Sequence, residues 1–153
     1  MYRLAITRDF IARHFLIGGD WGAENVEHSH HYKVQLRLDG DSLDAHGYLV
    51  DIVELEAALG EIIKRYRDRT LNELPAFAGR NPSLERFARL LYEELRQLPV
   101  LAGLGLELRL WENERDWAAC GAGATGPAAS DPTTSDPAAS AAGDRGPVRT
   151  DRR

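Results

Sequence analysis

Apolar and polar residues alternate along two segments near the N-terminus, a pattern that is typical of half-buried β-strands. The segments are residues 2–16 and residues 28–38. Successive side chains of a strand point to opposite faces, so residues two positions apart share a face. His14 therefore lies on the face that carries the aliphatic residues of the first strand. In the second strand, His28 and His30 share a face with the apolar residues Tyr32, Val34, Leu36 and Leu38.

Two later segments have the apolar period of amphipathic helices. Asp51, with Glu54 three residues further on, forms a capping box that predicts the start of the first helix. Asn81, Pro82 and Ser83 predict the start of the second, because a cap residue and a proline suit a helix N-terminus. The apolar stripes are Ile52, Leu55, Leu59, Ile62, Ile63 and Tyr66 in the first helix and Leu84, Phe87, Leu90, Leu91 and Leu95 in the second.

Leucines alternate with other residues from Leu104 to Leu110, which predicts a third strand that runs into Glu112. A last short strand is expected after it. The element order is then ββααββ. This order predicts an α+β fold, an antiparallel β-sheet with two helices packed on one face.

The composition changes near Cys120 and divides the chain in two. Residues 1–120 have ordinary globular composition and are enough for one modest core. From residue 121 to residue 153 the only aliphatic side chain larger than alanine is Val148. Such a segment buries too little apolar area to offset its ordering entropy, so it is predicted to be a disordered low-complexity tail.

Charge and hydropathy exclude several kinds of partner. The net charge is −5 and basic residues are scattered, so no footprint for nucleic acid is present. No segment approaches the roughly 20 apolar residues of a membrane span, and the N-terminus lacks a signal pattern. We therefore expect a cytoplasmic protein with neither nucleic acid nor membrane as a partner. A single cysteine agrees with a reducing compartment.

The histidines at positions 14, 28 and 30 are the strongest candidates for chemistry. His28 and His30 point the same way in a strand, whereas His31 points the other way. If the two strands pair, His14 joins them and the imidazoles converge. Three neutral imidazoles suit Zn²⁺, and a fourth position left for water or substrate is typical of a catalytic site. The alternative is a polar loop, because His-x-His also occurs on solvated strands.

Several short motifs resemble, in the same order, those of the 6-pyruvoyl-tetrahydropterin synthase and 6-carboxytetrahydropterin synthase family. The resemblance covers residues 2–120. The segments that carry it are Phe10-Ile-Ala-Arg-His14, His28-Ser-His30-His-Tyr32, Gly47-Tyr-Leu-Val-Asp51, Leu71-Asn72, Pro82-Ser-Leu-Glu85 and Leu110-Trp-Glu112-Asn.

The resemblance implies a T-fold that assembles into a homohexamer, because neighbouring subunits complete its open sheet edges. It implies zinc bound by His14, His28 and His30, and a pocket between chains for a pterin substrate, 7,8-dihydroneopterin triphosphate. Glu112 would anchor the pterin, since a carboxylate accepts paired N–H bonds from the aminopyrimidine edge. Ser83 would be a further substrate contact. The alternative for Glu112 is a solvated strand end.

The family's proton-transfer residues are not retained in this chain. Glu24 stands where the family has its catalytic cysteine, four residues before the first histidine of His-x-His. Arg67 and Asp68 stand where the family has an aspartate and a histidine after the first helix. Glu24 and Asp68 are therefore the candidate catalytic residues, and Cys120 is interpreted as structural.

Three functions are compatible with these departures. In the first, Glu24 is a general base, and the enzyme cleaves the substrate side chain to give 6-hydroxymethyl-dihydropterin for folate biosynthesis. This chain resembles a subgroup of the family that has glutamate at the cysteine position and is associated with that reaction. The second is a 6-carboxytetrahydropterin synthase of queuosine biosynthesis, in which Glu24 or Asp68 takes over the lost roles. In the third, Glu24 or Glu27 closes the site as a fourth ligand and leaves a noncatalytic zinc-containing pterin-binding module.

Overall fold

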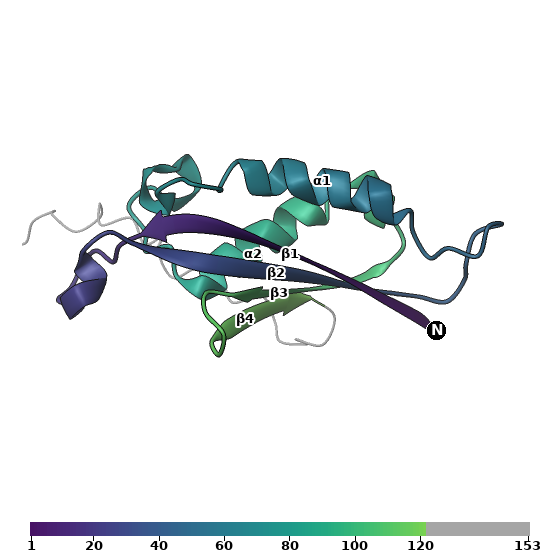
Figure 1. Ribbon diagram of the computed structural model, residues 1–153, viewed down its shortest axis with the longest axis horizontal. Coiled ribbons are helices and arrows are strands. Elements are labelled where there is room, and N and C mark those ends of the chain that lie inside the picture. The colour runs from purple at the N-terminus through teal and green to yellow at the C-terminus, as the bar shows by residue number, and fades with distance from the viewer. Residues whose placement is uncertain (122–153) are drawn as a thin grey trace, which may run out of the picture.

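The computed structural model describes residues 1–121, which form a four-stranded antiparallel sheet with two α-helices on one face (Figure 1). The strands lie in the order β1-β2-β3-β4. This architecture confirms the predicted α+β class and its ββααββ order. Most of the predicted tail, residues 122–153, lies outside the described residues. The bounds are β1 Tyr2–His14, β2 His28–Gly40, α1 Ile52–Lys64, α2 Leu84–Leu95, β3 Gly105–Trp111 and β4 Trp117–Gly121.

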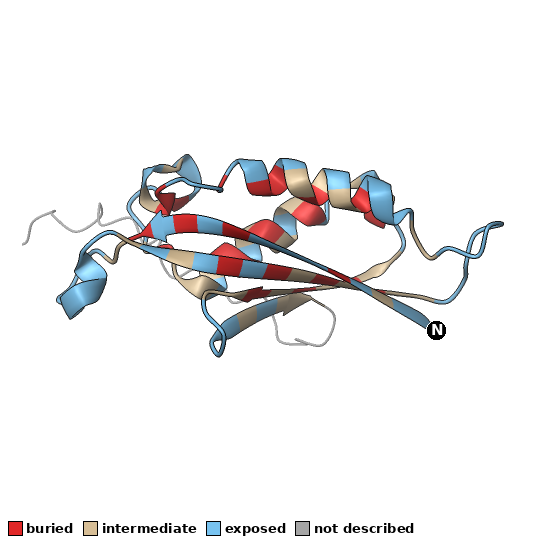
Figure 2. Cartoon of the chain, in the orientation of Figure 1, coloured by how far each residue is buried: buried red, intermediate tan, exposed pale blue. Residues whose placement is uncertain are grey.

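The pairing of β1 with β2 aligns the two histidine segments. His14 lies opposite His28, and Ala12 lies opposite His30, so the imidazoles occupy neighbouring positions on one face. The buried residues of both strands all lie on the face under the helices, as the sequence predicts, although Tyr2 and Arg8 on that face of β1 are exposed (Figure 2). The first strand ends at His14 rather than at residue 16. It ends there because the Leu16 N–H donates instead to the Glu24 carbonyl, at 2.7 Å, within the loop between the strands.

Each helix begins at a side-chain cap that the sequence predicts. The Asp51 carboxylate accepts the backbone N–H groups of Val53 and Glu54, at 2.8 and 3.3 Å. The Ser83 hydroxyl accepts the N–H of Arg86 at 3.3 Å. These bonds satisfy donors that a helix N-terminus leaves without a partner. The predicted stripes are buried except that Ile52 is exposed and that Leu84 and Leu90 are only partly buried.

An aromatic cluster joins α2 to the sheet next to the histidines. The Phe87 ring of α2 is fully buried and lies 6.0 Å from the ring of Phe10 on β1 and 5.3 Å from that of Tyr32 on β2. The Tyr32 ring in turn lies 5.7 Å from the ring of His30. Aromatic rings at these separations pack favourably beyond the area they bury. The cluster therefore fixes the start of α2 relative to the histidine-bearing ends of β1 and β2.

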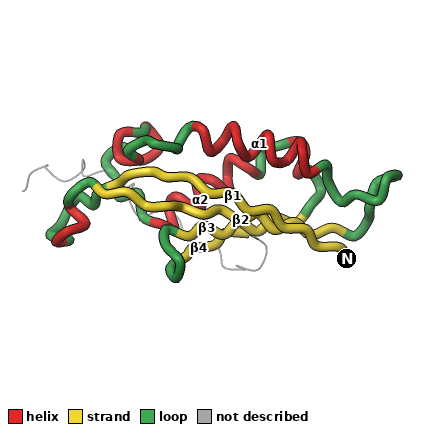
Figure 3. The backbone as a smooth tube through the Cα atoms, in the orientation of Figure 1, coloured by secondary structure: helices red, strands yellow, loops and turns green. Residues whose placement is uncertain are grey.

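Strand β3 is shorter than β2 and leaves part of β2 uncovered. The β2–β3 ladder runs from the pair Lys33–Trp111 to the pair Asp39–Gly105. Residues 28–32 of β2 therefore extend past the end of β3, where the chain turns through residues 112–116 into β4 (Figure 3). This step in the sheet leaves space beside the histidines. Neither α1 nor α2 is long and apolar enough to cross a membrane, and no other helix within residues 1–121 is.

Candidate metal centre

Three imidazoles and one carboxylate converge where β1 ends and β2 begins. The Nε2 atom of His14 lies 3.0 Å from Nε2 of His28 and 3.0 Å from Nε2 of His30. An oxygen of Glu24 lies 3.0 Å from Nε2 of His28. One ligand atom from each of these four residues lies within 4.8 Å of every other. The structure thus brings together the histidines that strand parity placed on one face.

Backbone carbonyls orient two of the imidazoles. Nδ1 of His14 lies 3.2 Å from the carbonyl of Pro82, and Nδ1 of His28 lies 2.8 Å from the carbonyl of Val26. A carbonyl oxygen can only accept, so each Nδ1 carries the proton and donates it. Nε2 of each ring is then available for a metal ion. Burial, with smaller contributions from His30 and His28, lowers the pKa of His14 and favours the neutral imidazole that a metal requires.

The spacing of the nitrogens fits a zinc ion. Unprotonated nitrogens whose lone pairs face one another repel, and a cation between them removes that repulsion. Nitrogens about 2.0–2.1 Å from one tetrahedral Zn²⁺ are about 3.3 Å apart. The 3.0 Å separations of the Nε2 atoms are close to that value. Three imidazoles leave a fourth position, and Glu24 lies near enough to take it or to act on a ligand there.

The loop between β1 and β2 holds Glu24 at the cluster. Glu24 lies in the short 3₁₀ helix Gly22–Asn25. The Asn25 amide ties this loop together by donating to the carbonyls of Leu16, at 2.9 Å, and Gly19, at 3.0 Å. The other acidic candidate, Glu27, is used elsewhere, because its carboxylate accepts the hydroxyl of Thr70 at 2.8 Å. Glu24, and not Glu27, is therefore the carboxylate that the structure places with the histidines.

Glu112 and Ser83 line a cavity next to the cluster. This cavity has a volume of about 480 Å³ and also contains His14, Glu24, Glu85 and Arg115, and we name it the metal-side cavity. Ser83 caps α2 with its hydroxyl oxygen, so the hydroxyl proton stays available for a ligand. The family resemblance implied that Glu112 and Ser83 contact the substrate; both line this cavity.

Burial raises the pKa of Glu112 above the usual range for a glutamate. His30 opposes this shift, whereas the carboxylates of Asp116 and Glu24, with a further contribution from Glu85, reinforce it. The same partly desolvated setting strengthens any hydrogen bond that the ionised carboxylate accepts. Glu112 is therefore suited to bind a ligand with N–H donors.

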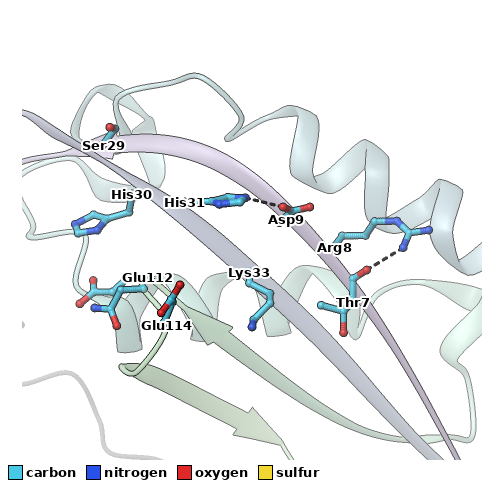
Figure 4. A pocket seen from close by; sticks show the side chains of 10 residues that line it. Thr7, Arg8, Asp9, Ser29, His30, His31, Lys33, Glu112 and Glu114 are labelled. Carbon is cyan, nitrogen blue, oxygen red and sulfur yellow. Dashed lines mark hydrogen bonds and ion pairs between the residues drawn. The ribbon is translucent and has the colours of Figure 1, made fainter.

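A second cavity, of about 460 Å³, opens at the step in the sheet (Figure 4). We name it the outer cavity. It shares Glu112 with the metal-side cavity and adds the outer-face residues Asp9, His31 and Lys33. His31 Nε2 lies 2.5 Å from a carboxylate oxygen of Asp9 across the β1–β2 ladder. His31 is thus paired on the opposite face of the sheet from the metal ligands, as strand parity predicts.

Asp68 does not belong to the metal cluster or to the lining of either cavity. It follows α1, and its backbone N–H donates to the carbonyl of Ile11, at 2.7 Å, along the edge of β1. Its φ of 59° lies in the left-handed region, which aspartate tolerates better than most residues. Within one chain the two candidate catalytic residues, Glu24 and Asp68, are therefore not brought together.

The metal-side cavity also contains residues that the sequence did not predict as part of a site. Glu85, Arg115 and Trp117 all line the metal-side cavity. Glu85 lies on the first turn of α2, two residues after Ser83. Its closeness in the sequence to this predicted substrate contact is the signal that could have identified it. Arg115 lies in the turn between β3 and β4, where neither periodicity nor the resemblance assigned a role.

Comparison with known proteins identifies the family of this chain. The family model described as 6-pyruvoyl tetrahydropterin synthase matches residues 3–122, and the chain belongs to this family. No curated protein matches the sequence significantly. The structure is similar to Caenorhabditis elegans 6-pyruvoyl tetrahydropterin synthase, with a TM-score of 0.68 and 18% identity over 79% of this chain and 95% of that one.

Two Plasmodium structures have the same fold. The Plasmodium falciparum 6-pyruvoyl tetrahydropterin synthase gives a TM-score of 0.63 with 15% identity, over 79% of this chain and 97% of that one. A Plasmodium vivax 6-pyruvoyltetrahydropterin synthase gives a TM-score of 0.61 with 18% identity, over 79% of this chain and 97% of that one. In that structure a glutamate described as a catalytic residue is replaced by alanine. These likenesses confirm the T-fold that the sequence motifs implied.

Proposed function

We propose that the protein is a zinc-dependent lyase of the pterin synthase type that acts on 7,8-dihydroneopterin triphosphate. The observation that supports this most is the convergence of His14, His28 and His30 beside one cavity that holds Glu24 and Glu112. This arrangement combines a metal-binding face, a proton acceptor and an acceptor for the substrate's N–H groups. The proposed cleavage of the pterin side chain uses all three.

Each residue has a distinct role in the proposed reaction. A zinc ion held by the imidazoles would supply Lewis-acid polarisation of the side-chain oxygens of the substrate. The carboxylate of Glu24 takes the proton that leaves the side chain, as a general base. Glu112 accepts the N–H groups of the aminopyrimidine edge and so fixes the ring. The Ser83 hydroxyl donates its proton to a ring or side-chain oxygen.

The P. vivax relative supports the role of Glu24, because a glutamate is described as a catalytic residue of that enzyme. Glu24 is the only glutamate in the metal cluster of the described chain. Its side chain is 52% exposed, so it can exchange a proton with solvent between turnovers. A carboxylate in this position can therefore serve where the family has a thiol.

A noncatalytic zinc-containing pterin-binding module is the second candidate function. It is favoured by the 3.0 Å separation between Glu24 and Nε2 of His28. Two ligands of one tetrahedral ion lie about that far apart, so Glu24 could close the coordination sphere. A closed site would bind a pterin at Glu112 without transforming it.

A product assay separates these functions. Zinc-loaded protein is incubated with 7,8-dihydroneopterin triphosphate, and the pterins are identified by mass. We expect a new 6-carboxy or 6-hydroxymethyl product, either of which supports the lyase and identifies its reaction. Unchanged substrate that stays bound to the protein would contradict the lyase and favour the binding module. The metal-free protein is the control and should form no product.

We also propose that the protein assembles into a homohexamer, in which Asp68 contributes to the site of a neighbouring copy. Strands β1 and β4 are the edges of the sheet within the described chain. Residues 68–70 pair only with the end of β1 near His14, and the rest of these edges can be completed by pairing with another subunit. Light scattering at micromolar concentration should give about six times the mass of one chain. A monomer would contradict the assembly and any role for Asp68 at the metal centre.

A further inference from the structure

Among residues 1–121, only one cationic side chain, that of Arg115, lines the metal-side cavity. The charged side chains around Arg115 in that lining are the carboxylates of Glu24, Glu85, Glu112 and Asp116. The guanidinium of Arg115 forms no hydrogen bond or ion pair with any other residue of the described chain, 1–121. An arginine among several carboxylates would ordinarily pair with one of them. This arginine is therefore available to a ligand.

The turn between β3 and β4 positions Arg115 without using its side chain. The side-chain oxygen Oδ1 of Asn113 accepts the backbone N–H groups of Arg115 and Asp116, each at 2.8 Å. The Asn113 amide donates to the carboxylate of Asp116, also at 2.8 Å. Of the two carboxylates adjacent to Arg115 in the sequence, Glu114 and Asp116, that of Asp116 is thus bound by Asn113. The backbone of the turn is fixed while the guanidinium is left without a partner.

The cations of the outer cavity are already engaged. Arg8 forms an ion pair with Glu56 of α1. The Nζ atom of Lys33 lies 4.9 Å from the centre of the Trp111 ring, within the range of a cation–π contact. Of the two cavities that meet at Glu112, the metal-side cavity is therefore the one with a cation free to bind an anion.

We infer that Arg115 binds the phosphate end of the substrate and makes the protein select phosphorylated pterins over unphosphorylated ones. This inference rests on the proposed function, which supplies the pterin triphosphate as substrate. A polyphosphate entering a cavity lined by carboxylates is repelled unless cations offset them. The planar guanidinium can hold two phosphate oxygens at once, which gives both charge and orientation.

The test compares two fluorescent ligands, neopterin triphosphate and neopterin, by anisotropy with the zinc-loaded protein. Because neither needs to be turned over, the measurement is independent of catalysis. Wild-type protein should prefer the triphosphate. Arg115→Gln should weaken binding of neopterin triphosphate by about 10- to 100-fold, as expected for a lost charge-assisted hydrogen bond, and change neopterin binding less than about twofold. Arg115→Lys keeps the charge and should weaken binding of neopterin triphosphate less than Arg115→Gln does.

Arg3→Gln is the matched control. Arg3 lies at the opposite end of β1 from His14 and pairs with Asp39, so this variant removes the same charge away from the cavity. It should bind both ligands as the wild type does. An equal loss of affinity for both ligands in Arg115→Gln, or no loss for either, would overturn this inference and leave the proposed function standing. Failure of both ligands to bind the wild-type protein would overturn the proposed function as well.

Discussion

Replacing both His28 and His30 with alanine is expected to reduce bound zinc from about one ion per chain to background. The double variant keeps only His14 and Glu24 of the cluster. Changes to groups that merely orient a metal ligand cost about 10- to 100-fold in affinity, so losing two ligands should cost at least about 10³-fold. Metal analysis after dialysis measures the effect. A double variant that retains one zinc per chain would refute the metal assignment.

His31→Ala is the control for this experiment. His31 is adjacent to His30 in the chain but lies on the other face of the sheet, where it pairs with Asp9. Its loss should leave zinc content unchanged, and this separates loss of a ligand from loss of any nearby imidazole. Circular dichroism checks that each variant remains folded. The alanines face the end of the core beyond Tyr32, so the sheet should persist.

Strand periodicity predicted the convergence of the histidines because it is a local property of two paired strands. Parity alone assigned His28 and His30 to one face and His31 to the other, and the ladder confirms both assignments. Helix starts were predictable for the same reason, since the caps at Asp51 and Ser83 act within a few residues. The family motifs added the order of the elements and thereby the T-fold.

The rest of the candidate site depends on contacts between segments that are far apart in the sequence, and local patterns do not predict such contacts. Glu85 and Arg115 are 30 residues apart in the sequence and line the same cavity only because α2 packs on the sheet through Phe87. The step that opens the outer cavity arises from the unequal lengths of β2 and β3, which periodicity gives only to within a few residues. Asp68 was selected by alignment to the family, and alignment carries no information on which copy's site it approaches.

Glu24→Gln is expected to lower turnover by about 10² to 10⁴, the range typical of general-base loss. Glutamine has the same size and can still form hydrogen bonds, yet it does not take up a proton at neutral pH. Zinc content and pterin affinity should hardly change, because the three imidazoles and Glu112 are untouched. Rates with 7,8-dihydroneopterin triphosphate, together with metal analysis of the same samples, measure the two effects separately.

Glu27→Gln supplies the matched control, because Glu27 is three residues away but binds Thr70 and lies outside the metal cluster. It should retain full turnover. If Glu24 is instead the fourth metal ligand, Glu24→Gln should loosen zinc, since a neutral amide is a weaker ligand than a carboxylate. Loss of zinc in this variant, combined with no turnover by the parent, would rule out the lyase and leave the pterin-binding module. Retained zinc with lost turnover would establish Glu24 as the base.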